Sequence, residues 1–515
     1  MMSLRRTAVG ITVLLMFAEG AVAYTLIRTS AGSAPLHWPA GSLPIMMELN
    51  DQIGPSLPNV APGSDPLGAI QRSLTKYPAV SAVQFQATTT SISSGGLDGA
   101  SIVSFADTPA NRQVFEMAGG NAVLGITLYF FSGATISEAD LLFNPSVQFT
   151  TTLASDAALN AAQQADVEAV ATHELGHVIG LHHTGVESAT MWSLSSILAR
   201  HLDADDIAGA RALYPVGGNV GSIMGRVTVN GGPAFGAQVV AVSASGATAA
   251  SALTLPDGTY TIEQLAPGTY QAYVEPLDGP HSAVQNMPCI RLGNLNGAGI
   301  YSGATLSTDF ATQFVDNVAV TANQATTVDF IPARGATTLN PVQVGPATVE
   351  DGSISASLGG IPLGVQAGTD QWVTVAGPDV DQVSASGIDV GPGIALDATS
   401  LHTLVFTCNT APLPAIVFHI TVDGAAAPGG RTIQLTTGNE TAAFTGALRV
   451  SPSGPCVGDC NHTGSVTVED LVTGANIVLG RFALDRCPAF NCNGNGRVTI
   501  DCLVAAVNNA LNGCM

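Results

Sequence analysis

Four of the chain's ten histidines lie within one eleven-residue stretch, HELGHVIGLHH, at residues 173–183. His173 and His177 are four residues apart, so on a helix they share a face and can bind one metal ion. Glu174 lies beside the first of them and can act as a base toward a water on that metal. The stretch therefore predicts a zinc site with hydrolytic chemistry.

A third zinc ligand must come from beyond the helix. Gly180 is placed to end the helix in a left-handed conformation, after which the chain turns back toward the metal. His183 then completes the spacing H-E-x-x-H-x-x-G-x-x-H, which is followed by a methionine in a turn. His182 competes for the third position but lies one residue off this spacing. Met191 is the candidate methionine and would form an apolar floor beneath the metal.

The flanking sequence predicts the elements that position these residues. Apolar residues recur at helical spacing from Val167 to Val178, which predicts a helix through the motif. A second helix is predicted within residues 203–215, with Asp203 as its N-cap and Pro215 just beyond its end. Strands are predicted in the stretches SAVQFQATT, ASIVSFAD and VLGITLYFF. Strands followed by helices indicate an α+β domain.

Length, charge and composition limit which classes of function the chain can have. A length of 515 residues suggests about three to five domains. Acidic residues outnumber basic ones, 38 to 16, so the net charge is −22 and no basic patch indicates a nucleic-acid partner. Charged residues make up only 10%, while glycine (57) and proline (29) are abundant, which favours short strands and turns.

The first 23 residues are predicted to be a signal peptide. Arg5 and Arg6 precede an uncharged, mostly apolar run, and Ala21–Ala23 form a small-residue cleavage site. The alternative is a membrane anchor, but the run is too short to span a bilayer and Glu19 interrupts it. No later run reaches transmembrane length. We therefore expect a secreted, extracellular or cell-surface-associated bacterial protein.

Six of the eight cysteines lie in the last 60 residues, which predicts disulfides formed in an oxidising compartment. A Cys-rich zinc site is the alternative, and the absence of a paired C-x-x-C argues against it.

The same region contains an internal repeat, in which an oxygen-rich loop leads into a helix. The first loop offers the calcium ligands Asp459, Asn461, Thr463 and Asp470. The second offers Asn491, Asn493, Asn495 and Asp501, a weaker set because Cys502 takes the final ligand position.

Between these regions, from residue 221 to about 450, strands alternate with glycine and proline turns. The turn signals DGTY and PGTY, at residues 257–260 and 267–270, lie about ten residues apart, which suits a β-sandwich. Residues 340–450 continue in the same style and predict a second sandwich. Residues 281–312 are irregular and are treated as an insertion.

Residues 24–216 resemble the matrixin branch of the metzincins, the family of matrix metalloproteases and their bacterial relatives. Besides the zinc motif, the stretches LHWPAGSLPIMMEL, ISEADLLFNP and LDADDIAGARALYP carry the resemblance. It implies a zinc endopeptidase whose peptide substrate lies along an edge strand. The zinc ligands would be His173, His177 and His183, the general base Glu174 and the Met-turn residue Met191.

Three departures from the matrixin pattern stand out. No cysteine occurs before Cys289, so the family's cysteine-switch propeptide is missing. Only His37 precedes the motif, so the residue set that holds the structural zinc and calcium in animal members is not found. The segment MWSLSS after the methionine lacks the usual proline and tyrosine that wall the specificity pocket, which leaves cleavage preference open.

Together, the resemblances predict a multidomain fold. After the signal peptide (1–23) it comprises an α+β metzincin catalytic domain (24–216), a carboxypeptidase regulatory-like β-sandwich (221–335), an Ig-like β-sandwich (340–450) and a small α-helical dockerin-like module (455–515). The dockerin resemblance implies calcium as a second cofactor and a cohesin-like or cell-surface partner.

The sequence thus predicts a secreted zinc endopeptidase that hydrolyses peptide bonds through a zinc-bound water, with Glu174 as general base. The alternative is a surface adhesion or scaffold protein whose protease-like head binds without cleaving. The intact set of three histidines and Glu174 favours the enzyme, because a relic would be expected to lose the glutamate or a ligand. Peptides or proteins are the expected substrates.

Overall fold

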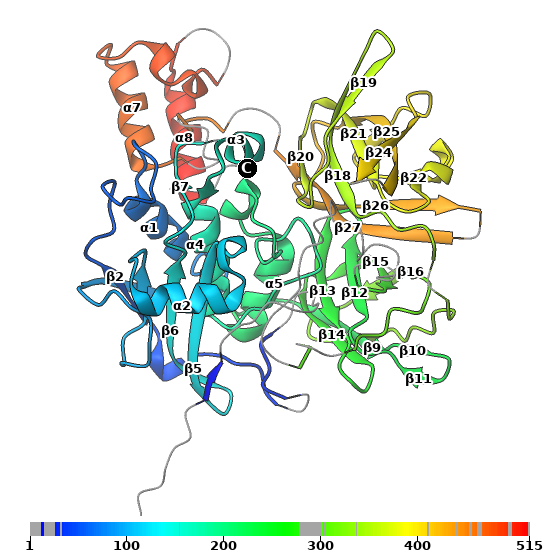
Figure 1. Cartoon of the computed structure of the whole chain (residues 1–515). Helices are drawn as coiled ribbons and strands as arrows, with labels where there is room; N and C mark the ends of the chain where they lie inside the picture. The colour runs from blue at the N-terminus through cyan, green and yellow to red at the C-terminus, as the bar shows by residue number, and fades with distance from the viewer. Residues whose placement is uncertain are drawn as a thin grey trace, which may run out of the picture.

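The structure is a computed structural model of the chain (Figure 1). It describes residues 12–14, 26–30, 33–153, 155–277, 300–301, 305–335, 337–408, 411–438, 440–452, 456–460, 466–492 and 497–512. Most of the predicted insertion lies outside these ranges, as do four of the predicted calcium ligands, Asn461, Thr463, Asn493 and Asn495.

The N-terminal part is built on a six-stranded sheet in the order β1-β5-β6-β4-β2-β3. Strands β6, β4, β2 and β3 run parallel to one another, while β5 runs antiparallel to β6. The strands are β1 (Thr12–Leu14), β2 (Ile45–Asn50), β3 (Phe85–Thr90), β4 (Ile102–Ser104), β5 (Gly125–Ser132) and β6 (Thr135–Phe143). A separate parallel pair joins β7 (Phe149–Thr150) to β8 (Ala165–Asp166).

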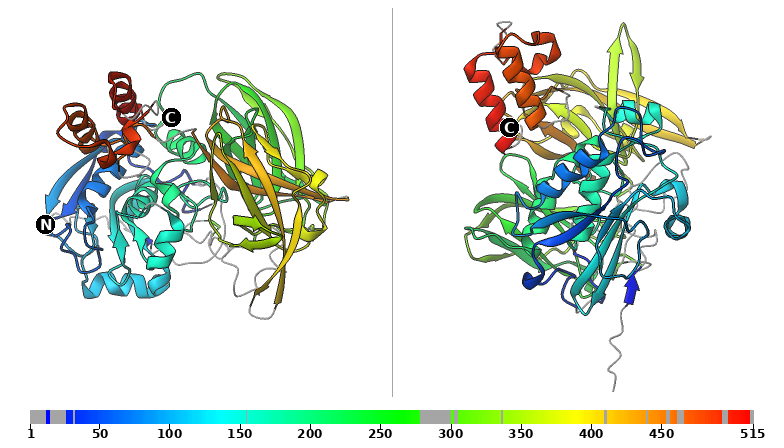
Figure 2. Two further views of the ribbon diagram at one scale, coloured as in Figure 1. Left: turned by 90° about the horizontal axis from the view of Figure 1, so that it is seen from above. Right: turned by 90° about the vertical axis from the view of Figure 1, so that its left-hand side faces the viewer.

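Helices lie between these strands as well as after them (Figures 1 and 2). They are α1 (Pro66–Lys76), α2 (Pro109–Ala118), α3 (Asp156–Ala162), α4 (Val167–Val178) and α5 (Ala204–Leu213), with short 3-10 turns η1 (Ala40–Ser42), η2 (Gly120–Ala122) and η3 (Ile197–Arg200). The predicted helices over the motif and after Asp203 are confirmed. Apolar side chains of α4 and of strands β2, β5 and β6 share one hydrophobic core.

The expected order, strands followed by helices, was wrong, because α1 and α2 precede β5. Both helices carry start signals that the hydrophobic pattern alone did not weigh. Asp65 and Thr108 are N-caps that accept backbone N–H bonds, and a proline occupies the first helical position of each helix. Both helices also bury one face at helical spacing, with Ala69, Ile70 and Leu74 inside in α1 and Phe115 and Ala118 inside in α2.

Strand β5 pairs with β6 on one side and with the short strand β1 on the other. Thr12–Leu14 pairs antiparallel with β5, with Thr12 opposite Phe131 and Leu14 opposite Tyr129. These three residues fall within the predicted signal peptide. The edge of β5 therefore accepts an extended segment in antiparallel register.

The middle of the chain is almost entirely β structure, and its strands form two pairs of sheets, each pair around its own core. The first pair has the orders β13-β12-β15-β16 and β14-β9-β17, and the second β19-β18-β21-β25-β23 with β24 on β25, and β20-β27-β26-β22. The boundaries 221–335 and 340–450 stay predictions.

The strands of the first pair are β9 (Gly221–Arg226), β12 (Gln238–Ser243), β13 (Thr248–Leu253), β14 (Thr259–Leu265), β15 (Gly268–Glu275), β16 (Gln313–Val320) and β17 (Ala325–Thr327), with the small hairpin β10 (Thr228–Val229) and β11 (Gly232–Pro233) beside them. Those of the second are β18 (Gln343–Glu350), β19 (Ser353–Ala356), β20 (Leu363–Gln366), β21 (Asp370–Ala376), β22 (Ile388–Asp389), β23 (Ile394–Leu396), β24 (His402–Cys408), β25 (Ala411–Val422), β26 (Gly429–Thr437) and β27 (Glu440–Ser451), with 3-10 turns η4 (Val380–Gln382) and η5 (Ala385–Gly387).

The C-terminal module consists of helices α7 (Val468–Val478) and α8 (Ile500–Asn512) and the 3-10 turns η6 (Leu484–Arg486) and η7 (Pro488–Phe490). Disulfides Cys460–Cys487 and Cys492–Cys502 link its loops and helices. The module lies beside the α/β part, on the side of α1 and α3 (Figures 1 and 2). Among the described residues, no helix is both long and apolar enough to cross a membrane.

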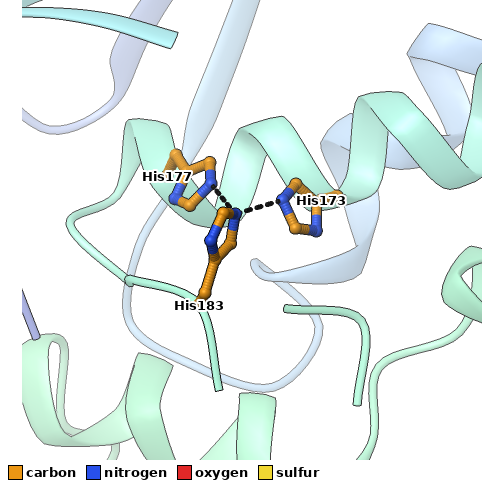
Figure 3. A group of neighbouring side chains, drawn as sticks. All are labelled: His173, His177 and His183. Carbon is orange, nitrogen blue, oxygen red and sulfur yellow. Dashed lines mark hydrogen bonds between the residues drawn. The ribbon is translucent and has the colours of Figure 1, made fainter. Parts of the chain in front are cut away.

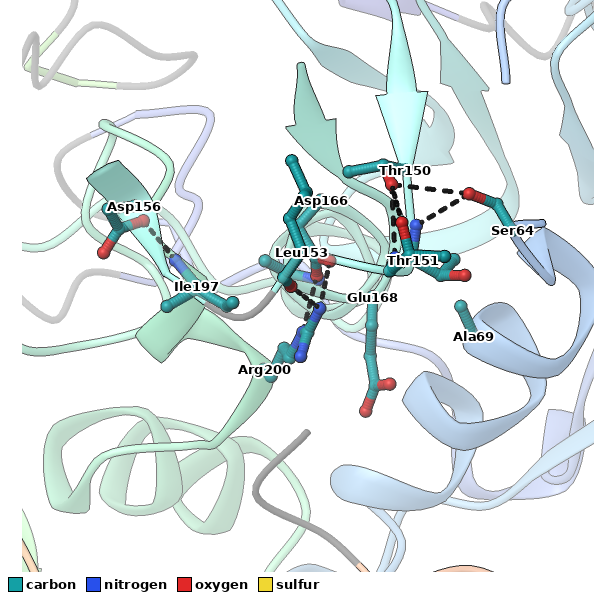
Figure 4. Close-up of polar contacts among 12 residues, drawn as sticks. Ser64, Ala69, Thr150, Thr151, Leu153, Asp156, Asp166, Glu168, Ile197 and Arg200 are labelled. Atoms are coloured by element: carbon teal, nitrogen blue, oxygen red, sulfur yellow. Dashed lines mark hydrogen bonds and ion pairs between the residues drawn. The ribbon is translucent and has the colours of Figure 1, made fainter. Parts of the chain in front are cut away.

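A buried ion pair fixes the start of α4 (Figure 4). Asp166 is the N-cap of α4 and accepts from Ala169 N–H, and the same carboxylate contacts Arg200 through both Nε and Nη2. The side chains are 0% and 3% exposed. Since Arg200 also donates to the carbonyl of Leu153, its charge is compensated on two sides.

We predict that Asp166→Ala lowers the free energy of unfolding by about 3–5 kcal/mol, because it leaves the buried Arg200 charge without its partner. Urea denaturation measures the change. Asp107→Ala is the control, since its pair with Arg112 is about half exposed and should contribute less than about 1 kcal/mol. Equal losses in the two variants would contradict the prediction.

Candidate metal centre

Three histidine rings meet at one point beside α4 (Figure 3). His173 and His177 project from the helix and His183 from the loop that follows it. The Nε2 atom of His183 lies 3.2 Å from Nε2 of His173 and 3.2 Å from Nε2 of His177. The structure thus brings together the three predicted ligands.

The hydrogen bonds on the far side of two rings point these nitrogens inward. Nδ1 of His173 lies 2.8 Å from the carbonyl of Thr190, and Nδ1 of His177 lies 2.9 Å from the carbonyl of Leu181. A carbonyl only accepts, so Nδ1–H is the donor in both and each Nε2 presents a lone pair. Burial lowers the pKa of His173 to about 4 and that of His177 well below its usual value, so both rings are neutral at pH 7.

These residues fit a zinc ion. A tetrahedral zinc about 2.0–2.1 Å from each nitrogen would hold the nitrogens about 3.3 Å apart, close to the 3.2 Å from His183 Nε2 to each of the other two Nε2 atoms. A cation also relieves the repulsion between lone pairs that face each other in a buried site. Among the residues that the structure describes, no other group of three or more His, Cys, Asp and Glu side chains is close enough to hold a metal.

Gly180 makes the turn that returns His183 to the helix. Its φ is +103°, a left-handed conformation that L-residues with side chains rarely adopt. A Cβ at this position would also meet the carbonyl oxygen of Leu36 at 2.2 Å. Gly180 N–H bonds to the carbonyl of His177, and α4 ends at Val178, one residue after its second ligand. Glycine is required here by both conformation and space.

Met191 lies beneath the ligand helix, as its role in a Met-turn requires. It is 2% exposed, and its sulfur would lie 2.2 Å from a Cβ added at Gly176, between the two helical ligands. The hydroxyl of Tyr77 donates to this sulfur over 3.6 Å. Met191 is therefore part of the packed floor of the site.

Asp206 of α5 holds the turn around Met191, a role that the sequence did not indicate. Its carboxylate accepts backbone N–H bonds from Thr190 and Met191, and it also closes the capping box of α5 on Asp203. Thr190 in turn accepts from the ligand His173. The capping-box spacing from Asp203 to Asp206 was visible in the sequence, but the second use of this carboxylate depends on tertiary contact.

Glu174 lies beside the triad and is 5% exposed. The hydroxyl of Thr127, on strand β5, donates to Oε2 of Glu174 over 2.7 Å. Burial raises the pKa of Glu174 to about 8, while the bond from Thr127 lowers it. Thr127 was not predicted as a site residue.

His182 is not part of this group of three histidines. Its Nδ1 accepts from the backbone N–H of His183, and the ring is buried beside Asp205 and Asp206. The described part of the chain therefore brings His183, and not His182, into the triad.

The predicted calcium loops are only partly described. Asp470 is 3% exposed, and its Oδ2 accepts from the N–H and hydroxyl of Thr467 in the capping box of α7. Asp459 is 4% exposed. Asn491 precedes the bridged Cys492, and Asp501 lies in α8. The structure thus assigns Asp470 a capping role, and its predicted part in binding calcium stays a prediction.

Comparison with known proteins agrees with this geometry. The family model of the matrixin peptidases matches residues 57–215. The matched range contains the three histidines and Glu174. Two plant proteins, Metalloendoproteinase 1-MMP and Metalloendoproteinase 4-MMP of Arabidopsis thaliana, are 45% and 41% identical to it over 51 residues. Those residues are 10% of this chain and only 14% and 15% of the two relatives.

Solved structures show weak likeness. The major pilin subunit BcpA of Bacillus cereus has 11% identity over 45% of this chain and 69% of its own, with a TM-score of 0.13. Fervidolysin of Fervidobacterium pennivorans, a keratinolytic enzyme related to subtilisin, has 15% identity over 33% and 29%, with a TM-score of 0.15. Likenesses this low add nothing to the assignment, so the matrixin domain rests on the family match and the triad.

We predict that His183→Ala loses bound zinc and that His182→Ala retains it. Removing a ligand should lower zinc affinity by more than the roughly 10–100-fold that loss of an outer hydrogen-bond partner costs. Atomic absorption after dialysis measures the zinc content of both variants. Retention of zinc by His183→Ala, with loss from His182→Ala, would reverse the assignment of the third ligand.

Proposed function

We propose that the chain is a secreted zinc-dependent endopeptidase of the matrixin type. The observation that carries the proposal is the convergence of His173, His177 and His183 beside the buried carboxyl of Glu174, within the range that matches the matrixin family. A surface adhesion protein with a non-catalytic head needs no carboxyl beside the metal ligands, so Glu174 favours the enzyme.

In this proposal His173, His177 and His183 would hold a zinc ion. When bound, it would supply a Lewis acid for the scissile carbonyl and a lowered pKa for the attacking water. Glu174 accepts a proton from that water on its carboxylate and later donates it to the leaving amine nitrogen. Thr127 fixes the rotamer of Glu174 through its hydroxyl.

The substrate peptide is proposed to add to the edge of β5 opposite β6. This edge pairs with Thr12–Leu14 at residues 129–131, whereas Thr127, which contacts Glu174, lies further along the same strand. An extended peptide on this edge would bond through its backbone and leave side chains to decide preference. Peptides or proteins are therefore the proposed substrate class.

The C-terminal module is proposed to dock to a cohesin-like or cell-surface partner, with calcium in its loops. Both helices present exposed apolar side chains at helical spacing. On α7 these are Val468 and Val472, followed by Leu479 at its C-cap, and on α8 they are Ile500, Val504 and Val507. Export, which agrees with the disulfides of this module, is part of the same proposal.

We predict that Glu174→Ala keeps zinc and the fold but lowers the rate of peptide hydrolysis by about 10²–10⁴-fold, the usual contribution of a general base. Cleavage of casein, with and without a chelator, measures activity, and zinc content is measured in parallel. Glu116→Ala, which removes an exposed carboxylate of α2, is the matched control. Unchanged casein turnover by Glu174→Ala would refute the assignment.

A further inference from the structure

The polypeptide between the third ligand and α5 is packed against both β-sandwich regions. We call Glu187–Leu202 the 187–202 segment. It reaches the metal centre directly, since the carbonyl of Thr190 accepts from Nδ1 of His173. The same segment contains Met191. Anything that fixes or displaces this segment therefore acts on the surface next to the triad.

Arg449, on strand β27 of the second sandwich, binds the 187–202 segment at both of its ends. Its Nη1 donates to the carbonyls of Ser188 and Leu198 over 3.0 Å each. Its Nη2 donates to the carbonyls of His201 and Leu202 over 3.0 and 3.3 Å. The side chain of Arg449 is 11% exposed, and its Nε lies 3.9 Å from the Asp203 carboxylate. One side chain thus satisfies four carbonyls of a segment that lacks regular structure over most of its length.

Two glycines of the second sandwich make room for this contact. A Cβ at Gly446 would lie 2.7 and 2.9 Å from the backbone nitrogens of Ser188 and Glu187. A Cβ at Gly430 would lie 2.0 Å from the hydroxyl of Ser188. The approach is close enough for Glu187 N–H to bond to the carbonyl of Thr445 over 3.0 Å. Backbone therefore meets backbone across this interface.

Trp192, the residue after Met191, anchors the middle of the segment. Its indole N–H donates to the carbonyl of Gly360 over 3.0 Å, and the ring is 4% exposed. The ring packs in a hydrophobic core with Leu253, Leu277 and Tyr301. The residue that follows the Met-turn is thus buried between parts of the chain that lie far downstream in sequence.

From these contacts we infer that Arg449 is a positioning residue of the peptidase and that the second sandwich belongs to its active unit. The inference rests on the proposed function. Arg449 holds the 187–202 segment in place beside the triad, and that segment then sets how a substrate side chain binds next to the metal. The planar, five-donor guanidinium suits four converging carbonyls, which an ammonium cannot match.

The first test compares Arg449→Met and Arg449→Lys in the full chain, with Arg334→Met as control because the pair of Arg334 with Asp309 is about two-thirds exposed. Amide exchange within the 187–202 segment should accelerate about tenfold or more in Arg449→Met, as expected for lost charge-assisted hydrogen bonds. KM for peptides that vary the residue after the scissile bond should rise by a similar factor, with zinc content unchanged. Lysine should restore only part of both, and Arg334→Met should change neither.

The second test uses a matched pair of glycines. Gly446 and Gly352 have nearly the same φ, +76° and +78°, but a Cβ at Gly352 would meet nothing within 4 Å. Gly446→Ala should therefore reproduce the exchange and KM changes of Arg449→Met. Gly352→Ala carries the same backbone strain and should leave both unchanged.

Exchange rates that stay unchanged in Arg449→Met, or that match between Gly446→Ala and Gly352→Ala, would overturn the inference. So would faster exchange with unchanged KM and cleavage preference in an active enzyme. If the wild-type chain shows no chelator-sensitive cleavage, the proposed function fails separately. Exchange in the variants then still decides whether Arg449 positions the segment.

Discussion

The metal centre depends on a pair of carbonyl oxygens that orient two imidazole rings. Thr190 and Leu181 accept from Nδ1 of His173 and His177, and this forces both Nε2 lone pairs toward His183. Each carbonyl has its own support. Leu181 follows the left-handed Gly180, while Asp206 of α5 fixes the amide of Thr190. The helix stop at Gly180, the turn at Met191 and helix α5 thus all hold the two carbonyls that orient the imidazole rings.

The sequence predicted the ligand set because its spacing is local. His173, His177, Gly180 and His183 lie within eleven residues, where helix geometry and a single glycine determine which side chains converge. The residues that support this set were not predicted, because Thr127, Asp206 and Arg449 act from distant positions. An aspartate at the third position of a helix looks like a cap, and only the folded chain shows that the same carboxylate also binds Thr190 and Met191.

The same distinction between local sequence signals and long-range contacts applies to the fold. The two helices next to the metal site have apolar periodicity or strong caps and were predicted with nearly correct bounds. Helices α1 and α2 were missed, although each begins with an N-cap followed by proline and buries apolar residues along one face. The sandwich strands were indicated by their turns. Their contact with the peptidase depends on Gly430 and Gly446, whose meaning appears only when the opposing backbone is in place.

Arg449 follows Ser188 by 261 residues. A chain made from its N-terminus therefore holds all three histidines and Glu174 long before the guanidinium that organises their neighbouring segment exists. During that interval, the segment between Ser188 and Leu202 has four carbonyls that must bond to water or to transient partners. The zinc motif is therefore synthesised before the residue that orders its neighbouring segment. Synthesis of both sandwiches separates the two.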